Sequence, residues 1–159
     1  MDVRALAPVA GICVLVVVVI LLASALVTGL TGMGLDGTPP QATIEVTAIA
    51  DEAGGKVILR HAGGAALALD SVTLVIEVDD QPLRHQPTVP HIQPTGFRDP
   101  LTGPFNIRSS DQWRAGEAGE FRLARTNEPT IDAGATVTVF VYVDDQQIDT
   151  ATAVARASG

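Results

Sequence analysis

The hydrophobic residues of this chain follow two patterns, and the change from one to the other falls near residue 40. Residues 9–35 form an uncharged run of 27 residues that is apolar on every side, without the polar stripe of an amphipathic helix. As an α-helix this run would be about 40 Å long, which exceeds the roughly 30 Å hydrocarbon core of a bilayer. Because a helix satisfies its own backbone in lipid, the run predicts a long hydrophobic helix.

From residue 42 onward, apolar and polar residues alternate with a period of two, and no helical period follows Leu35. The clearest case is the segment 136–143, where four valines share one face. Glycine and aspartate pairs separate the alternating segments, as expected for turns between antiparallel strands. The predicted strands span residues 42–50, 56–62, 70–78, 118–125, 136–143 and 147–155. The predicted fold is an N-terminal long hydrophobic α-helix followed by an all-β immunoglobulin-like antiparallel sandwich.

A proline-rich segment interrupts the strands. Residues 82–104 contain six prolines, which excludes a central strand over most of this length. We call this segment the excursion and expect it to be a long surface loop that faces outward. Loops of this length commonly carry function, so its deletion is expected to spare assembly and to alter adhesion.

Composition adds a strong acidic bias. The net charge is −8, aspartate outnumbers glutamate twelve to six, and Lys56 is the only lysine beside nine arginines. An acidic, lysine-poor surface stays hydrated in concentrated salt, which indicates a salt-loving source, although an ordinary acidic secreted domain remains the alternative. The sign of the charge argues against nucleic acid as a partner. The only cysteine, Cys13, lies in the apolar run, so no disulfide framework is expected.

Few residues indicate reaction chemistry. His85 and His91 flank a proline-rich bend and could meet a metal, but no carboxylate or thiolate clearly joins them. His61 falls in a strand and is interpreted as a core or edge histidine. The pairs Asp79-Asp80 and Asp144-Asp145 are interpreted as exposed turn residues. With no nucleophile, phosphate-loop or metal-helix motif, we expect no enzyme, no cofactor and no metal site.

The start of the chain carries a more specific motif. Residues 4–11 read RALAPVAG, and a Val/Ile/Leu run and then Pro-Pro-Gln-Ala-Thr follow them. This arrangement resembles the N-terminal family of archaeal type IV pilins. The residues that match the family motif are Arg4, Ala5, Pro8, Val9 and Gly11, and those that depart from it are Leu6, Ala7 and Ala10.

The resemblance implies a processing site. A membrane prepilin peptidase would cleave between Ala5 and Leu6, behind Arg4, and would leave the hydrophobic helix on the mature chain. The domains implied are a leader at residues 1–5, a transmembrane or filament-core helix at 6–35, a hinge at 36–41 and a β-sandwich head at 42–159.

The same resemblance implies a structural subunit of a type IV pilus-like surface filament. The precursor would sit in the membrane with its N-terminus cytoplasmic, and the mature protein would be extracellular. Copies would form a homo-polymer around their helices, where Ala25 and Gly29 permit close approach, and the head would serve adhesion. Two alternatives stay open: a single-pass membrane-anchored extracellular binding domain, and a secreted sandwich released by signal peptidase after Ala25.

Overall fold

The computed structural model describes residues 38–159, which form a β-structure with one core. The chain divides into two units between Thr38 and Pro39, a boundary inside the segment 36–41 for which a hinge is predicted. The elements in chain order are β1 (Ala42–Ala50), β2 (Lys56–Gly64), β3 (Leu67–Ala68), β4 (Val72–Val78), β5 (Gln81–Pro82), the 3₁₀ turn η2 (Gly103–Phe105), β6 (Gln112–Trp113), β7 (Ala118–Arg122), β8 (Thr136–Val143), β9 (Gln146–Val154) and β10 (Arg156–Ala157).

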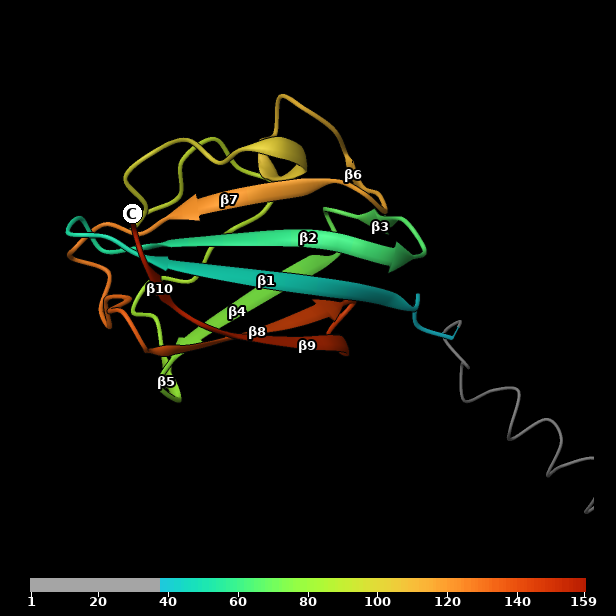
Figure 1. The fold of residues 1–159 in the computed structure, drawn as a ribbon. Helices are drawn as coiled ribbons and strands as arrows, with labels where there is room; N and C mark the ends of the chain where they lie inside the picture. The colour runs from blue at the N-terminus through green and yellow to red at the C-terminus, as the bar shows by residue number, and fades with distance from the viewer. Residues whose placement is uncertain (1–37) are drawn as a thin grey trace, which may run out of the picture. The chain divides into compact units, whose positions relative to one another are not determined.

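Two four-stranded sheets make up the two layers, with the strand orders β10-β1-β2-β7 and β5-β4-β8-β9. Figure 1 shows the first sheet across the front and the strands of the second sheet crossing beneath it. A small third sheet pairs β3 with β6. Neighbouring strands of the two large sheets are antiparallel, except that β10 pairs with β1 in parallel, where Ile49 faces Arg156.

The core lies between the two large sheets and is built from the alternating residues. Leu74 in β4 faces Val141 in β8, and both are fully buried. An aromatic group closes one end of the core: the Phe105 ring lies 4.8 Å from both Trp113 and Phe121, measured between ring centroids. Burying such side chains is the main favourable contribution to folding.

The predicted strands are confirmed. The segments 42–50 and 136–143 match β1 and β8 to the residue, and the other four match β2, β4, β7 and β9 within a few residues. The strands of only two residues, β3, β5, β6 and β10, were not predicted, because two residues are too few to show alternation.

The predicted fold class is corrected to all-β. Within residues 38–159 the only helical element is the three-residue turn η2, and no helix there is long and apolar enough to cross a membrane. Apolar residues in this part of the chain repeat every two positions. This period places them on one face of a strand, whereas in a helix it would spread them over all faces. The hydrophobic helix predicted over residues 6–35 lies outside the described residues.

The excursion is also different from the prediction. It contains no central strand, as expected, but Leu83, Val89, Phe97 and Leu101 are buried in the core. The excursion therefore covers the sandwich instead of projecting from it as a free loop.

Hydrogen bonds fix the excursion to both sheets. The Gln86 side chain accepts from the amide of Ile76 (2.7 Å) and donates to its carbonyl (3.0 Å), so it pairs with the edge of β4 as a strand would. On the other sheet, the Thr102 hydroxyl accepts from the amide of Glu120 (2.9 Å) in β7. One edge of each large sheet, at β4 and at β7, is thus partly covered.

Candidate functional site

The site residues inferred from the family resemblance all precede the part of the chain that the structure describes. The cleavage site (Arg4, Ala5 and Leu6) and the filament-core positions (Pro8, Val9, Gly11, Ala25 and Gly29) lie among residues 1–37. Their roles stay predictions. The candidate surfaces that the structure does describe are on the excursion and on the loop that follows it.

One end of the excursion carries a polar hollow. His85 and His91, which the sequence placed on either side of a bend, both line it, together with Arg84, Gln86, Thr88, Gln93, Pro94 and Thr95. The Nδ1 atom of His91 accepts a hydrogen bond from the amide of Gln93 (3.1 Å), so this nitrogen is already engaged. No group of three potential metal-ligating side chains occurs within residues 38–159. The hollow therefore offers two imidazoles without the further ligands that a zinc site requires.

Asn127 holds this hollow in place from beneath. Its side chain is fully buried, accepts from the amide of His85 (2.8 Å) and donates to the carbonyl of the same residue (2.9 Å). Gly96, with φ of +87°, packs so closely on Asn127 that an added Cβ would lie 2.8 Å from its amide nitrogen. No sequence pattern predicts this contact, because 42 residues separate Asn127 from His85.

Asp51 fixes the far end of the excursion to the turn between β1 and β2. Its Oδ1 accepts from the amides of Ala53 and Gly55, both at 2.9 Å, and its Oδ2 pairs with Arg98. Burial acts to raise the pKa of Asp51, but the amides of Gly55 and Ala53 and the Arg98 guanidinium outweigh it, so the pKa is lowered from 3.8. Asp51 is therefore held in its charged form.

His61 is a core residue. It is fully buried in β2, its Nε2 lies 2.8 Å from the carbonyl oxygen of Ala65, and its ring meets Trp113 edge-on at 5.6 Å. The prediction of a core or edge histidine is confirmed as to the core, but the ring is not fully satisfied, because its buried Nδ1 has no hydrogen-bond partner within the described residues.

The two aspartate pairs form tight turns. Asp79, Asp80, Asp144 and Asp145 all have φ between +48° and +63°, the left-handed conformation that two-residue hairpins require, and all four are exposed. Asp79 also accepts a hydrogen bond from the amide of Thr136 (2.8 Å). Their structural role as exposed turn residues is confirmed.

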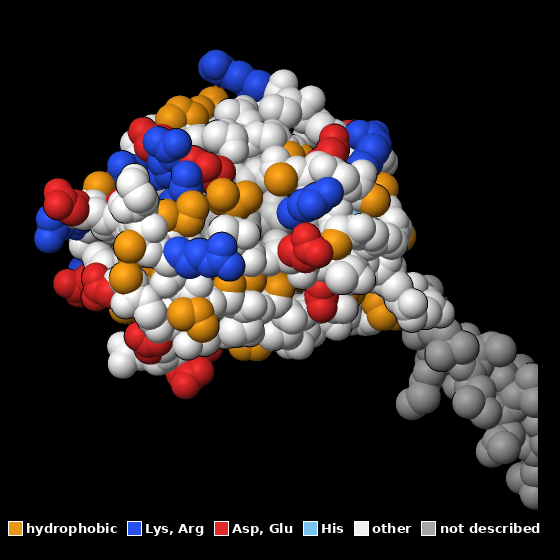
Figure 2. Space-filling model, viewed as in Figure 1, with side chains coloured by type: hydrophobic (Ala, Val, Ile, Leu, Met, Phe, Trp, Pro, Cys, Tyr) orange, Lys and Arg blue, Asp and Glu red, His pale blue; other side chains and the backbone are white. Residues whose placement is uncertain are grey.

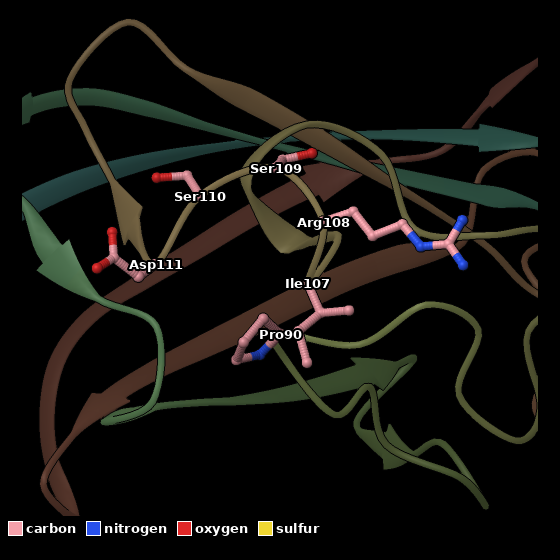
Figure 3. Close-up of a pocket in the computed structure, with 6 residues that line it drawn as sticks. All are labelled: Pro90, Ile107, Arg108, Ser109, Ser110 and Asp111. Atoms are coloured by element: carbon pink, nitrogen blue, oxygen red, sulfur yellow. The ribbon is translucent and has the colours of Figure 1, made fainter.

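A second, more apolar hollow lies on the loop after η2. Figure 3 shows its six lining residues, with Pro90 and Ile107 at the centre, the Arg108 guanidinium on one side and the Asp111 carboxylate on the other. Ile107 is 58% exposed. Sequence reasoning did not identify this hollow, because a single isoleucine in a loop belongs to no periodic pattern.

A comparison of the chain with protein-family models and with curated proteins finds no match.

Proposed function

We propose that the chain is a structural subunit of a type IV pilus-like surface filament, with its all-β domain exposed as the head. The observation that carries this proposal is the position of the cleavage motif. Arg4-Ala5-Leu6 stands directly before the uncharged run, so a cut after Ala5 removes five residues and leaves residues 9–35 on the mature protein. An ordinary signal peptidase would instead remove the hydrophobic segment.

The physical argument concerns where such a segment can exist. An uncharged segment of 27 residues avoids water either in lipid or among other apolar segments. Transfer from the membrane into a bundle of identical copies exchanges lipid contacts for protein contacts, and Ala25 and Gly29 give small surfaces for close packing. Assembly into a filament therefore never exposes the segment to water.

The head domain has properties that suit a crowded array of copies. Within residues 38–159, the buried side chains of its hydrophobic core run from Ile44 to Ala155. Two of its sheet edges are partly covered: Gln86 and β5 lie along the edge of β4, and Thr102 and Phe97 lie along β7. A covered edge cannot readily pair with a strand of a neighbouring head. The outer strands on the opposite sides of the two sheets are β9 and β10.

The test is the N-terminus and location of the mature protein in cells. We expect mature chains that start at Leu6 and that are found in sheared surface fibres, with prepilin peptidase required for both. A substitution of Arg4→Asp should block processing, whereas Asp2→Asn, which leaves Arg4-Ala5-Leu6 intact, should not.

Two results would contradict the proposal. A mature chain that begins at Leu26 would indicate a secreted domain, because the apolar run would be lost up to Ala25. A chain that begins at Leu6 or Met1 but stays in the membrane fraction, never in fibres, would indicate a single anchored domain.

A further inference from the structure

Two of the exposed large hydrophobic residues lie next to each other. Within residues 38–159, the large hydrophobic side chains classed as exposed are Ile92 (41%), Ile107 (58%) and Val154 (61%). A parallel bridge joins His91 to Asn106, and the amide of Ile107 donates to the carbonyl of His91 (3.3 Å), so Ile92 and Ile107 follow the two ends of the same bridge. Single exposed hydrophobic residues are common, whereas apolar residues on neighbouring segments begin a contiguous patch of the kind that interaction surfaces use.

Pro90 completes the apolar centre, and we call Pro90, Ile92, Ile107, Arg108 and Asp111 the contact patch. Figure 2 shows one face of the domain, on which hydrophobic side chains lie beside basic ones over the loops at the upper left. The patch residues lie on the excursion (Pro90 and Ile92) and on the loop after η2 (Ile107, Arg108 and Asp111).

Opposite charges flank this centre, and neither is used inside the domain. Lys56, Arg84, Arg98 and Arg122 all pair with carboxylates of the same chain. The side chains of Arg108 and Asp111 form no ion pair and no hydrogen bond with any residue between 38 and 159, whereas the backbone amide of Arg108 donates to the Asn106 side chain. Figure 3 shows that they point to opposite sides of Pro90 and Ile107.

This arrangement is self-complementary. A two-fold rotation about an axis through the apolar centre exchanges the two sides of the patch, so it brings the cation of one copy opposite the anion of the other. We propose that the contact patch is a two-fold docking surface for a second copy of this chain, in which Arg108 of each copy pairs with Asp111 of the other around the two Ile107 side chains.

The net charge of −8 opposes contact between two copies, because the chains repel one another. A contact between copies therefore needs local pairs of opposite sign. The rotation supplies two such pairs. A patch of this few residues gives a weak contact of the small-interface class, which becomes effective where many copies are held close together.

The proposal does not depend on filament assembly. A two-fold contact closes on itself and cannot propagate along a helical array. In a filament it would join subunits of two neighbouring filaments, and on a membrane it would join two anchored chains.

Cysteine crosslinking of the full chain in detergent tests the contact. In a Cys13→Ala background, Ile107→Cys should form a disulfide-linked dimer on mild oxidation, because residue 107 meets itself at a two-fold axis. The matched control is Val154→Cys, which is equally exposed but lies on β9, outside the patch. The Val154→Cys variant should form only the fraction of crosslinked dimer that random collisions produce. This fraction should fall when the protein is diluted with detergent.

A charge swap then tests the orientation. In the Ile107→Cys chain, Arg108→Asp or Asp111→Arg alone places like charges together twice and should reduce crosslinking by about tenfold. The double variant Arg108→Asp/Asp111→Arg restores both pairs and should recover the original level. The side chains of both residues are exposed and unpaired, so each variant should stay folded. The fluorescence emission of the buried Trp113 should therefore match that of the wild type.

The proposal is overturned if Ile107→Cys crosslinks no more than Val154→Cys, or if the double variant is as weak as the single ones. The latter result would point to a different partner for the patch, or to a contact without two-fold symmetry. Chains that are found in sheared fibres but fail this assay would contradict the contact and leave the filament proposal standing. Chains that crosslink but never enter fibres would support the two-fold contact and contradict the filament proposal.

Discussion

At the scale of single residues, polar side chains hold the parts of the domain that have no regular sheet. Asn127 and Gln86 both use their amide groups to pair with backbone, Asn127 with His85 and Gln86 with Ile76. Each accepts from the amide and donates to the carbonyl of the same residue, which is the pattern of a neighbouring strand. These side chains let a proline-rich segment lie on the sheets, although its prolines lack the amide protons that a strand would use.

Replacement of Asn127 measures this effect. Asn127→Ala removes a fully buried side chain and leaves the amide and carbonyl of His85 without their partners in a part-buried contact, so we expect the free energy of unfolding to fall by about 2 kcal/mol. Denaturant unfolding followed by the fluorescence of Trp113, the single tryptophan, gives this value. The exposed Gln81→Ala variant should change stability by less than about 0.5 kcal/mol. Equal stability of Asn127→Ala and the wild type would show that the excursion does not depend on this contact.

Asp51 gives the domain a defined sensitivity to acid. Its pKa in the folded state is lowered from 3.8, so its charge stabilises the fold fully above the pKa of the unfolded chain. This contribution is lost as the pH falls through the lower, folded-state pKa. The difference in unfolding free energy between the wild type and Asp51→Asn should therefore be constant from pH 7 to about 5 and should shrink below about pH 4. A difference that grows in acid would contradict this sign.

At the scale of elements, the long strands follow from the sequence and the excursion does not. β1, β4 and β8 show strict alternation, and their apolar positions form the core. The excursion buries Phe97 and Leu101 without any period, because its backbone follows no repeating geometry. Prolines identified it as irregular, but only its packing identifies it as part of the core.

The excursion is therefore required for folding. We expect deletion of residues 84–104 to abolish the folded head, instead of sparing assembly as the sequence suggested, because the core would lose Val89, Phe97 and Leu101. Loss of the cooperative unfolding transition in circular dichroism would confirm this. A folded deletion variant would show that the two sheets suffice alone.

A single substitution just after the excursion should destabilise the domain less than the deletion does. Phe105→Ala removes a fully buried ring that contacts Trp113 and Phe121, and should lower the unfolding free energy by about 3–5 kcal/mol. Two residues further along, Ile107→Ala alters an exposed side chain and should change it by less than about 0.5 kcal/mol. Denaturant titrations of the two variants, made side by side, test whether burial distinguishes these neighbours.

At the scale of the whole molecule, the net charge of −8 acts against the compact state through self-repulsion. Added NaCl shortens the Debye length from about 10 Å at 0.1 M to about 3 Å at 1 M, so it should raise the unfolding free energy of this chain. Thermal unfolding in 0.1 and 1 M NaCl measures the effect. The double variant Asp144→Asn/Asp145→Asn changes the net charge from −8 to −6 and should respond less, since asparagine also accepts the left-handed turn. Destabilisation by salt would mean that attractive ion pairs outweigh the repulsion.

The sequence alone determined the strands, the turns and the chemical character of this protein. Alternation with a period of two needs only local information, because successive side chains of a strand point to opposite faces. The same local reading predicts the cleavage motif at Arg4–Leu6 and the apolar run, which lie outside the described residues. Charge and lysine content likewise follow from composition.

Only the tertiary structure decided which separated residues meet. The bonds of Asn127 to His85, the pairing of Asp51 with Arg98 and the patch around Ile107 all join segments that are distant in the chain or lack any period. Such contacts depend on how two sheets and an irregular segment pack together. Packing is a property of the folded chain as a whole, so it cannot be predicted from a local pattern of residues.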